Sequence, residues 1–599
     1  MSRLIQRGPR VPEKSKRGIL GVLREIFSYS DSMKLPTAAA LLFAACGAVL
    51  TIIGPDLLSR ITDLISDGLT GRIDMGAIGR VGALLLAVYG FSAVFTYVEH
   101  FIMATVTLKL SFAMRQDLSR KINRVPMSYF SRVSYGDILS RVTNDVSTLQ
   151  QALANSMPSM ISASVQFAGC LVMMFVTEWR MALAAVAVTV LGFLIMGGVM
   201  LHSQKYFIAR QQNLSTLNGY IEEMYSGHDV VRLSRADRKI KKSFREMNAA
   251  LYQTEWRSQF LSGVMQPLMN IVGNLGYVAV CVLGSALAMN GAISFGVIVA
   301  FIMYVRLFTS PLSTLAQGMT QMQTAAAAGD HIFDFLHEEE MPDETGKNSA
   351  PENIRGEVEF EHVRFSYPDT PDKIIIRDFS AHIQPGQKVA IVGPTGAGKT
   401  TMVNLLMRFF EINRGCIRID GIPTSDMTRE SVHNLFSMVL QDTWLFEGTV
   451  RENLVYNRTG VTDEELEKAC RACGIYHFIE TLPQGFDTVL DSSVAVSAGQ
   501  KQLLTIGKAM VQNNPMLILD EATSSVDTRT ELITQKAMDQ LTQHRTSFVI
   551  AHRLSTIKNA DLILVLKDGD IIEQGTHEQL LAEGGFYADL YNSQFEKAS

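Results

Sequence analysis

The sequence predicts a six-helix α-helical transmembrane domain followed by an α/β P-loop domain. Three observations predict it. Residues up to about 328 are dominated by long uncharged apolar runs, and residues 356–599 contain a Gly-rich loop after a short apolar strand. Residues 329–355 are predicted to form a linker between them, because the stretch "HEEEMPDETGKNSAPENIRG" is charged and without periodicity. At 599 residues the chain is also too long for one ordinary domain.

Residues 1–34 are predicted to form a basic tail and an elbow helix. Lys and Arg are frequent up to Arg17, and the following "GILGVLREIF" has apolar residues at helical spacing. Such a helix could lie flat on the inner membrane surface or lead directly into the first span. No cleavable signal peptide is expected, because no apolar run closely follows the basic stretch.

Residues 35–328 are predicted to hold six membrane spans. A bilayer core of about 30 Å needs about 20 apolar residues per helix. Uncharged runs cover 35–55, 81–98 with an apolar continuation through Thr107, 146–177, 181–204 and 258–305, the last divided by a turn at Asn290-Gly291. A buried helix of a soluble protein would not repeat this length six times.

Lys and Arg predict the orientation of the spans. Residues 109–145 hold seven of them and residues 205–257 hold ten, whereas the short loops after the first, third and fifth spans hold few. Both long loops and the C-terminal half are therefore expected in the cytoplasm. Each long loop is predicted to continue the helices and to carry a polar elbow, at 134–137 and at 219–229.

Arg306 is the one charge embedded in the sixth predicted span. An ionisable residue inside a membrane commonly lines a cavity or pairs with an acid, which makes Arg306 a functional candidate. Snorkelling toward the membrane surface, or a purely structural pair, is an equally open interpretation.

The segment "KVAIVGPTGAGKTT" matches the phosphate-binding pattern G-x-x-x-x-G-K-[ST] between a strand and a helix. Its glycines, Gly393, Gly396 and Gly398, allow the backbone to wrap around phosphates. Lys399 would neutralise the β- and γ-phosphates, and the hydroxyl of Thr400 would bind Mg²⁺.

The segment "NPMLILDEATSSVD" is predicted to place two carboxylates at the end of a buried strand, residues 516–519. Asp520 suits water-mediated coordination of Mg²⁺, and Glu521 suits polarising an attacking water. A carboxylate here could instead only cap a helix, but the presence of the phosphate-binding loop favours the catalytic interpretation.

Six motifs together resemble the nucleotide-binding domain of ATP-binding cassette (ABC) transporters: "FSYPD", "GPTGAGKTT", "VLQDTWLF", "VSAGQKQLL", "LILDEATSSVD" and "IAHRLSTI". With the six spans, the chain resembles a type IV, exporter-type half-transporter over nearly its whole length. The resemblance therefore implies that residues 356–599 form an ABC ATPase domain that uses ATP and Mg²⁺.

The family implies a role for each matching residue. Tyr367 would stack on adenine, Gln441 would sense Mg²⁺, His552 would contact the γ-phosphate, and Asp527 would couple two ATP sites. Catalysis would rest on Glu521, His552 and Gln441, and Mg²⁺ would be held by Thr400, Gln441 and Asp520. The implied nucleotide-binding residues are Tyr367, Gly393, Pro394, Thr395, Gly396, Ala397, Gly398, Lys399, Thr400 and Thr401.

In this family a segment like "VSAGQ" caps ATP held by a partner domain, so the chain is expected to work as a dimer. The implied segment is Ser497, Ala498, Gly499 and Gln500, at the start of a helix, where backbone N–H groups favour an anion. Val496, Ala498 and Lys501 depart from the usual Leu, Gly and Arg. Phosphate binding should survive these changes.

The basic N-terminal extension resembles that of one subunit in bacterial heterodimeric multidrug exporters. In such pairs one subunit keeps the catalytic Glu and the other loses it, and Glu521 would make this chain the subunit that keeps it. A heterodimer with a second half-transporter is therefore favoured over a homodimer. The segment "DTVLDSSVA" lacks the Gly-containing acidic stretch common in homodimeric exporters, so its contact with the elbows is expected to differ.

The resemblance implies ATP-driven efflux of an amphipathic or hydrophobic solute (a drug, lipid or peptide) by alternating access. The expected location is the cytoplasmic membrane of a bacterium, with membrane lipid as a partner and without nucleic acid. Two alternatives remain open: import of a metal chelate by the same fold, and an ATP-gated regulatory membrane switch that moves no solute.

Overall fold

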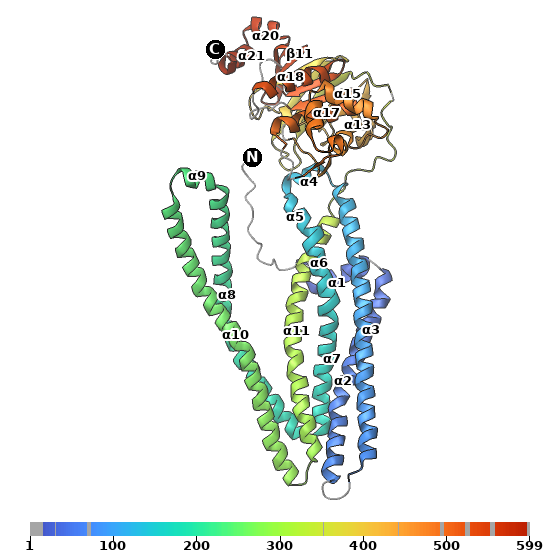
Figure 1. Cartoon of the computed structure of the whole chain (residues 1–599), viewed down its shortest axis with the longest axis vertical. Coiled ribbons are helices and arrows are strands. Elements are labelled where there is room, and N and C mark those ends of the chain that lie inside the picture. The colour runs from blue at the N-terminus through green and yellow to red at the C-terminus, as the bar shows by residue number, and fades with distance from the viewer. Residues whose placement is uncertain are drawn as a thin grey trace. The chain divides into compact units, whose positions relative to one another are not determined.

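The computed structural model describes residues 16–29, 31–68, 73–351, 353–440, 443–491, 496–520, 528–550 and 557–595. As far as they are described, these residues fold into two compact units. The first comprises Met1–Asn123 and Tyr135–Glu338, and the second comprises Arg124–Ser134 and Glu339–Ser599. Long helices build the first unit, and strands covered by shorter helices build the second (Figure 1).

The first unit is helical. Its helices are α1 (Gly18–Tyr29), α2 (Lys34–Gly68), α3 (Met75–Ile122), α5 (Tyr135–Ser140), α6 (Val146–Gln151), α7 (Met157–Thr177), α8 (Trp179–Ser226), α9 (His228–Leu233), α10 (Asp237–Met289) and α11 (Phe295–Leu336). By length and composition, six stretches could cross a membrane: Asp31–Gly68, Met75–Ile122, Tyr135–Thr177, Trp179–Ser226, Asp237–Met289 and Phe295–Leu336. The prediction of six spans is confirmed.

The second span differs from the expectation in one respect. Its apolar continuation through Thr107 is interrupted by Glu99 and His100, which lie within α3. The Glu99 side chain is buried, with 4% of the residue exposed. A single carboxylate barely lowers the mean hydropathy of a long apolar window, and the sequence-based expectation missed it for this reason.

Four long helices pack together in the first unit. Helix α2 contacts α3, α7 and α11, whereas α8 pairs mainly with α10. Figure 1 shows α8 and α10 side by side, diverging from the other spans toward α9. Helix α1 packs on the C-terminal part of α11: its Val22 and Ile26 are buried, and the Arg17 guanidinium forms ion pairs with Asp330 (3.1 Å) and Asp334 (2.8 Å).

The second unit contains a ten-stranded sheet in the order β5-β4-β1-β2-β12-β11-β3-β10-β9-β6. The strands are β1 (Val358–Ser366), β2 (Ile374–Ile383), β3 (Lys388–Val392), β4 (Arg414–Ile419), β5 (Ile422–Pro423), β6 (Phe436–Val439), β9 (Met516–Asp520), β10 (Thr546–Ile550), β11 (Leu562–Lys567) and β12 (Asp570–Gly575). A separate pair consists of β7 (Gly448–Thr449) and β8 (Val489–Leu490).

Helices complete the second unit. They are α4 (Met127–Arg132), α12 (Lys399–Leu406), α13 (Arg429–Asn434), α14 (Val450–Val455), α15 (Asp463–Ala472), α16 (Tyr476–Thr481), α17 (Ala498–Gln512), α18 (Thr528–Thr542), α20 (His577–Glu583) and α21 (Phe586–Phe595). The fold predicted for the C-terminal half, an α/β ATPase domain, is confirmed.

Parallel pairing brings the functional ends of three strands to one edge of the sheet. Strand β10 pairs with β3 on one side and with β9 on the other, both in parallel. The three strands are buried almost throughout, as parallel strands covered on both faces usually are. Loops that follow β3 and β9 therefore start from the same edge, where α/β sheets commonly bind ligands.

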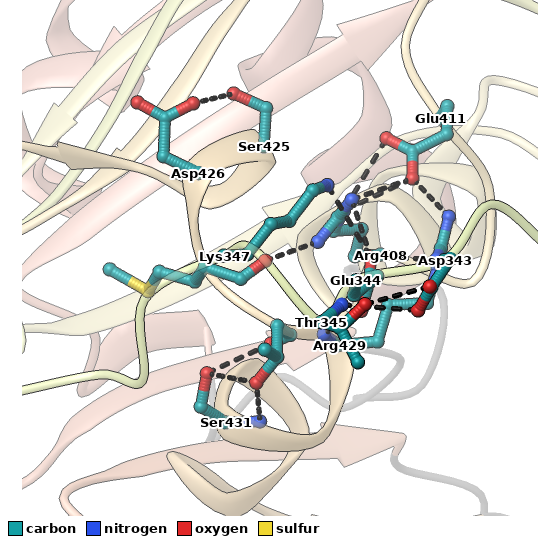
Figure 2. Close-up of polar contacts among 12 residues, drawn as sticks. Asp343, Glu344, Thr345, Lys347, Arg408, Glu411, Ser425, Asp426, Arg429 and Ser431 are labelled. Atoms are coloured by element: carbon teal, nitrogen blue, oxygen red, sulfur yellow. Dashed lines mark hydrogen bonds and ion pairs between the residues drawn. The ribbon is translucent and has the colours of Figure 1, made fainter.

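The segment before β1 is fixed to the second unit by a cluster of charges. Oε1 of Glu344 lies 2.9 Å from Nη2 of Arg408 and 2.7 Å from Nη1 of Arg429, and Glu411 contacts both guanidinium groups. Figure 2 shows these side chains converging. The backbone N–H of Arg429 also donates to Oε2 of Glu344, at 2.6 Å. Burial raises the pKa of Glu344, but this hydrogen bond and the two guanidinium charges outweigh it, and the net pKa is lowered.

Replacing Glu344 with Gln should destabilise the second unit. Arg408 is only 4% exposed, and the substitution removes one of the two carboxylates that compensate its charge. We expect a loss of about 1–3 kcal/mol and a melting temperature lower by a few degrees. Because the pKa of Glu344 is lowered on folding, its contribution is present above the ordinary Glu pKa and is lost as the pH falls below it.

Thermal unfolding of the full chain in detergent at pH 7 measures this effect. The matched control is Glu361→Gln, because Glu361 pairs with Arg418 (3.1 Å) where both side chains are about one-third exposed or more. An exposed pair contributes little. Equal melting temperatures for the Glu344 and Glu361 variants would contradict a structural role of the cluster.

Candidate functional site

The Gly-rich loop lies between the buried strand β3 and helix α12, as the motif requires. Gly393 has φ 155° and Gly398 has φ 103°, both in the region that favours glycine. A Cβ atom on Gly393 would lie 2.2 Å from the carbonyl oxygen of Leu566, and one on Gly398 would lie 2.7 Å from Cδ1 of Ile376. These two glycines are therefore needed for the close approach of the loop to β11 and β2.

Lys399 occupies the centre of the loop. Its ammonium group donates to the carbonyl oxygens of Gly393 (2.7 Å) and Pro394 (3.1 Å), and the residue is 9% exposed. Burial lowers the pKa of Lys399, and the negative charge of Asp520 partly offsets this effect. The ammonium is thus held where the loop backbone turns, and a phosphate entering the loop would meet both its charge and the surrounding N–H groups.

The other loop residues divide into an exposed rim and a buried base. Pro394, Thr395, Gly396 and Thr400 are exposed, whereas Ala397 and Thr401 are buried. Exposure leaves the Thr400 hydroxyl, at the start of α12, accessible to a ligand. The buried Thr401 hydroxyl is used internally, in a hydrogen bond with the hydroxyl of Tyr367 (3.0 Å).

The ring of Tyr367 is held in place beside the loop. It meets Phe365 and Phe410 edge to face, with ring centroids 5.0 Å and 5.1 Å away. Together with the Thr401 hydrogen bond, these contacts fix the ring at the end of β1, near the start of α12. A fixed, half-exposed aromatic ring is suited to stacking on a planar base.

Asp520 is brought near Lys399 by strand pairing. Asp520 is the last residue of β9 and pairs in register with Ile550 of β10. Ile550 in turn pairs with Ile391, near the end of β3. The opposite charges of Asp520 and Lys399 interact across this edge. The structure therefore joins two motifs that lie about 120 residues apart in the sequence.

The segment Ser497–Gln500 forms a reciprocal cap at the start of α17. The Ser497 hydroxyl accepts a hydrogen bond from the backbone N–H of Gln500 (3.3 Å), and Oε1 of Gln500 accepts one from the N–H of Ser497 (2.9 Å). Ser497 and Ala498 are exposed, and Gly499 is buried. The S-x-x-Q spacing predicts this capping box, but the sequence analysis did not use that signal.

Four residues with predicted roles cannot be placed. Gln441, Glu521, Asp527 and His552 lie outside the described residues. Within the described part of the chain, the structure brings together Tyr367, Lys399, Thr401 and Asp520. In that same part, no group of three or more His, Cys, Asp or Glu side chains forms a metal site by itself.

Helix α4 contacts the loop that carries Tyr367. Nε of Arg132 lies 3.1 Å from Oδ1 of Asp369, and the Ser131 hydroxyl donates to Oδ2 of the same residue (3.2 Å). Asp369 lies two residues after Tyr367, in a turn closed by the hydrogen bond from Thr370 N–H to Tyr367 O (3.0 Å). The first predicted elbow, residues 134–137, follows α4 directly. The second, residues 219–229, covers the end of α8 and the start of α9.

Arg306 lies on α11 and is exposed in the described chain. Its backbone carbonyl accepts a hydrogen bond from the Thr309 hydroxyl (3.4 Å). Its side chain does not line the polar cavity among α2, α3, α7 and α11, to which α11 contributes Ser310, Pro311 and Thr314.

Comparison with known proteins supplies independent evidence. Residues 37–312 match the family model described as "ABC transporter transmembrane region", and residues 376–524 match the model "ABC transporter". The chain is 40% identical to "Fatty acid ABC transporter ATP-binding/permease protein" of Mycobacterium bovis over 97% of both chains. It is 38% identical to "Uncharacterized ABC transporter ATP-binding protein YfiC" of Bacillus subtilis, over 96% of this chain and 95% of the relative. It is 32% identical to "ATP-dependent lipid A-core flippase" of Syntrophus aciditrophicus, over 84% and 83%.

Proposed function

The chain belongs to the ABC transporter family, and from this premise we propose that it exports an amphipathic or hydrophobic solute across the cytoplasmic membrane of a bacterium. It is a multi-pass membrane protein whose cytoplasmic ATPase domain couples ATP hydrolysis to transport. The observation that carries the proposal is the placement of Lys399 inside the Gly-rich loop, with Asp520 at the end of β9, two strands from β3.

ATP is proposed to bind with its phosphates in the loop Gly393–Thr401 and its adenine on Tyr367. The Lys399 ammonium would move from the Gly393 and Pro394 carbonyls to the β- and γ-phosphates. Thr400 and Asp520, with Gln441, would hold Mg²⁺, because hydroxyl and carboxylate oxygens are the ligands that this ion prefers. When bound, Mg²⁺ would neutralise charge that develops on the phosphates. Glu521 would orient and polarise the attacking water, and His552 would contact the γ-phosphate.

Tyr367→Ala should weaken nucleotide binding. Loss of an aromatic ring that stacks on a base costs about 1–3 kcal/mol, which equals about 5- to 150-fold in affinity. Tyr367→Phe is the matched control, since it keeps the ring and removes only the hydroxyl that contacts Thr401. Equilibrium binding of ATP to the full chain in lipid nanodiscs measures the effect. Equal affinity for the Ala and Phe variants would show that the ring does not contact the base.

The ATP site is proposed to close only between two chains, as ABC transporters work as dimers. Ser497 and Ala498 are exposed at the N-terminus of α17, where the backbone N–H groups favour an anion. These residues, with Gly499 and Gln500, would cap the γ-phosphate bound to the partner, and Asp527 would couple the two sites. We propose a heterodimer with a second half-transporter, in which this chain supplies the catalytic Glu521.

Purification of the chain alone in nanodiscs tests this composition. We expect a monomer, or a dimer with little ATPase activity, that becomes active when the partner half-transporter is added. A stable homodimer with full activity that is abolished by Glu521→Gln would overturn the heterodimer and leave the ATP site intact.

Transport is proposed to follow from closure of the ATPase domains. The elbows at 134–137 and 219–229 would carry that closure into the spans, which would alternate between inward- and outward-open states. To shift the population of the two states from 1:99 to 99:1, ATP must bind one state more tightly than the other by about 5.5 kcal/mol.

Relatives named for fatty acid and lipid A-core transport support a lipid-like cargo among the drugs, lipids and peptides considered. A transport assay with a labelled amphiphile distinguishes the three functions. Outward movement driven by ATP would support export, inward movement would support import, and no movement would support a regulatory switch.

A further inference from the structure

A polar cavity of about 320 Å³ lies among the spans of the first unit. Helices α2, α3, α7 and α11 supply its walls, and small residues such as Gly47 make room for it. Its polar lining consists mostly of hydroxyls, together with the Glu99 carboxylate, the His100 imidazole and the Gln166 amide. Such a lining inside a membrane indicates a ligand, because apolar side chains would fill the same space at lower cost.

Glu99 is a buried carboxylate that lines this cavity. Its Oε1 atom is buried and has no hydrogen-bond partner in the described structure, and its Oε2 atom lies 3.8 Å from Nε2 of His100. Glu99 lies ten residues before the exposed Lys109 in α3, which corresponds to about 15 Å along the helix axis. A carboxylate at this depth with one oxygen that has no hydrogen-bond partner is costly, so a cation that reaches it would be bound favourably.

The hydroxyls around Glu99 present acceptors. Each forms a hydrogen bond as donor to a backbone carbonyl: Thr51 and Ser92 to Gly47 (both 3.0 Å), Thr96 to Ser92 (3.0 Å), Ser159 to Asn155 (2.6 Å) and Ser162 to Ala44 (3.2 Å). The Thr51 and Ser92 hydroxyls also lie 3.2 Å apart, within hydrogen-bond distance of each other. What these groups still offer to the cavity is oxygen lone pairs. The lining therefore combines a negative charge with several acceptors, and its complement is a positively charged donor.

The volume restricts the class of cation. A cavity of about 320 Å³ is far larger than a bare metal ion and falls in the size range of organic ligands. An alkylammonium group carries one positive charge and up to three N–H donors, which match the carboxylate and the hydroxyl oxygens. A free carboxylate would be repelled by Glu99, and a neutral alcohol would leave its charge uncompensated.

We propose that this cavity binds the ammonium group of an amphipathic amine, with Glu99 as its counter-ion and the hydroxyls of α2, α3 and α7 as its hydrogen-bond acceptors. The inference rests on the proposed function in that the amine would be a transported cargo. It narrows the cargo from amphipathic solutes in general to those that carry a protonated amine.

Binding of three matched fluorescent probes tests the proposal. They are 1-naphthylmethylamine, 1-naphthalenemethanol and 1-naphthoate, which share a ring system and differ in charge. Each is titrated at pH 7 onto the full chain in lipid nanodiscs, with empty nanodiscs to subtract partition into lipid. We expect the amine to bind most tightly, and Glu99→Gln to weaken its binding at least about tenfold. Ser162→Ala, which removes one acceptor and keeps the charge, should weaken it by a smaller factor.

Glu178→Gln is the matched control, because Glu178 caps α8 through an oxygen that Gln retains and does not line the cavity. Amine affinity of Glu99→Gln within twofold of the unmodified chain, or equal binding of all three probes, would overturn the proposal. A melting temperature of the Glu99→Gln protein close to that of the unmodified chain shows that it is folded. Amine binding without ATP-driven transport would refute the proposed export and leave this site standing, whereas transport without selective amine binding would refute only the site.

Discussion

Glu521→Gln is expected to reduce ATP hydrolysis at least about 10²-fold while leaving ATP affinity nearly unchanged, because a positioned general base contributes about 10²–10⁴ to the rate. The amide keeps the size of the carboxylate but cannot take a proton from the attacking water. Binding depends on groups elsewhere in the site, the Lys399 ammonium and the loop backbone. The variant should therefore hold ATP in a closed dimer and accumulate in that state.

The rate of phosphate release measures ATP hydrolysis, and the amount of nucleotide that the protein retains measures ATP binding. Glu583→Gln provides the matched control, since Glu583 is exposed at the end of α20. Near-normal hydrolysis by the Glu521 variant would show that another residue activates the water. Loss of binding together with hydrolysis would show that Glu521 supports the structure of the site and does not act as the base.

Lys399→Ala should weaken ATP binding, whereas Glu521→Gln should affect only hydrolysis. Lys399 is 9% exposed, and its ammonium group lies at hydrogen-bond distance from two loop carbonyls, where a phosphate would meet it. Removing one partner of a buried charged contact costs about 2–5 kcal/mol, or about 30- to 5,000-fold in affinity. Hydrolysis should be lost at ordinary ATP concentrations as a consequence.

Equilibrium ATP binding and thermal unfolding, measured together, check the Lys399 prediction. Lys468→Ala is the matched control, because Lys468 is exposed on α15. An unchanged melting temperature with lost affinity would support direct contact with phosphate. Unchanged affinity would contradict the assignment of the loop.

The spans were predictable because each depends on local composition. Twenty uncharged apolar residues need no knowledge of the rest of the chain, and the six runs became six helices. Glu99 and His100 show the limit of that reasoning. A window average hides one carboxylate, and the cavity that gives Glu99 its meaning forms only when α2, α3, α7 and α11 pack together.

The site was predictable to a similar extent. The Gly-rich loop is a local pattern, and the structure places it between β3 and α12 as the motif requires. The approach of Asp520 to Lys399 depends on β10 lying between β9 and β3, which follows from strand order and cannot be read from either motif. The contacts of Glu344 with Arg408 and Arg429 could not be predicted, because residues 337–356 show no periodicity and the two arginines lie more than 60 residues away.

Transport into inverted membrane vesicles, in which the ATPase domain faces outward, directly measures whether the protein exports amphiphiles. The full chain, with its partner half-transporter where required, is given ATP and one labelled amphiphile at a time: an amine, a fatty acid and a phospholipid. If the protein is an exporter, we expect ATP-dependent accumulation of at least one of these amphiphiles inside the vesicles, and no accumulation with Glu521→Gln. ATP-driven depletion of the vesicle interior, or hydrolysis with no movement of any amphiphile, would contradict export.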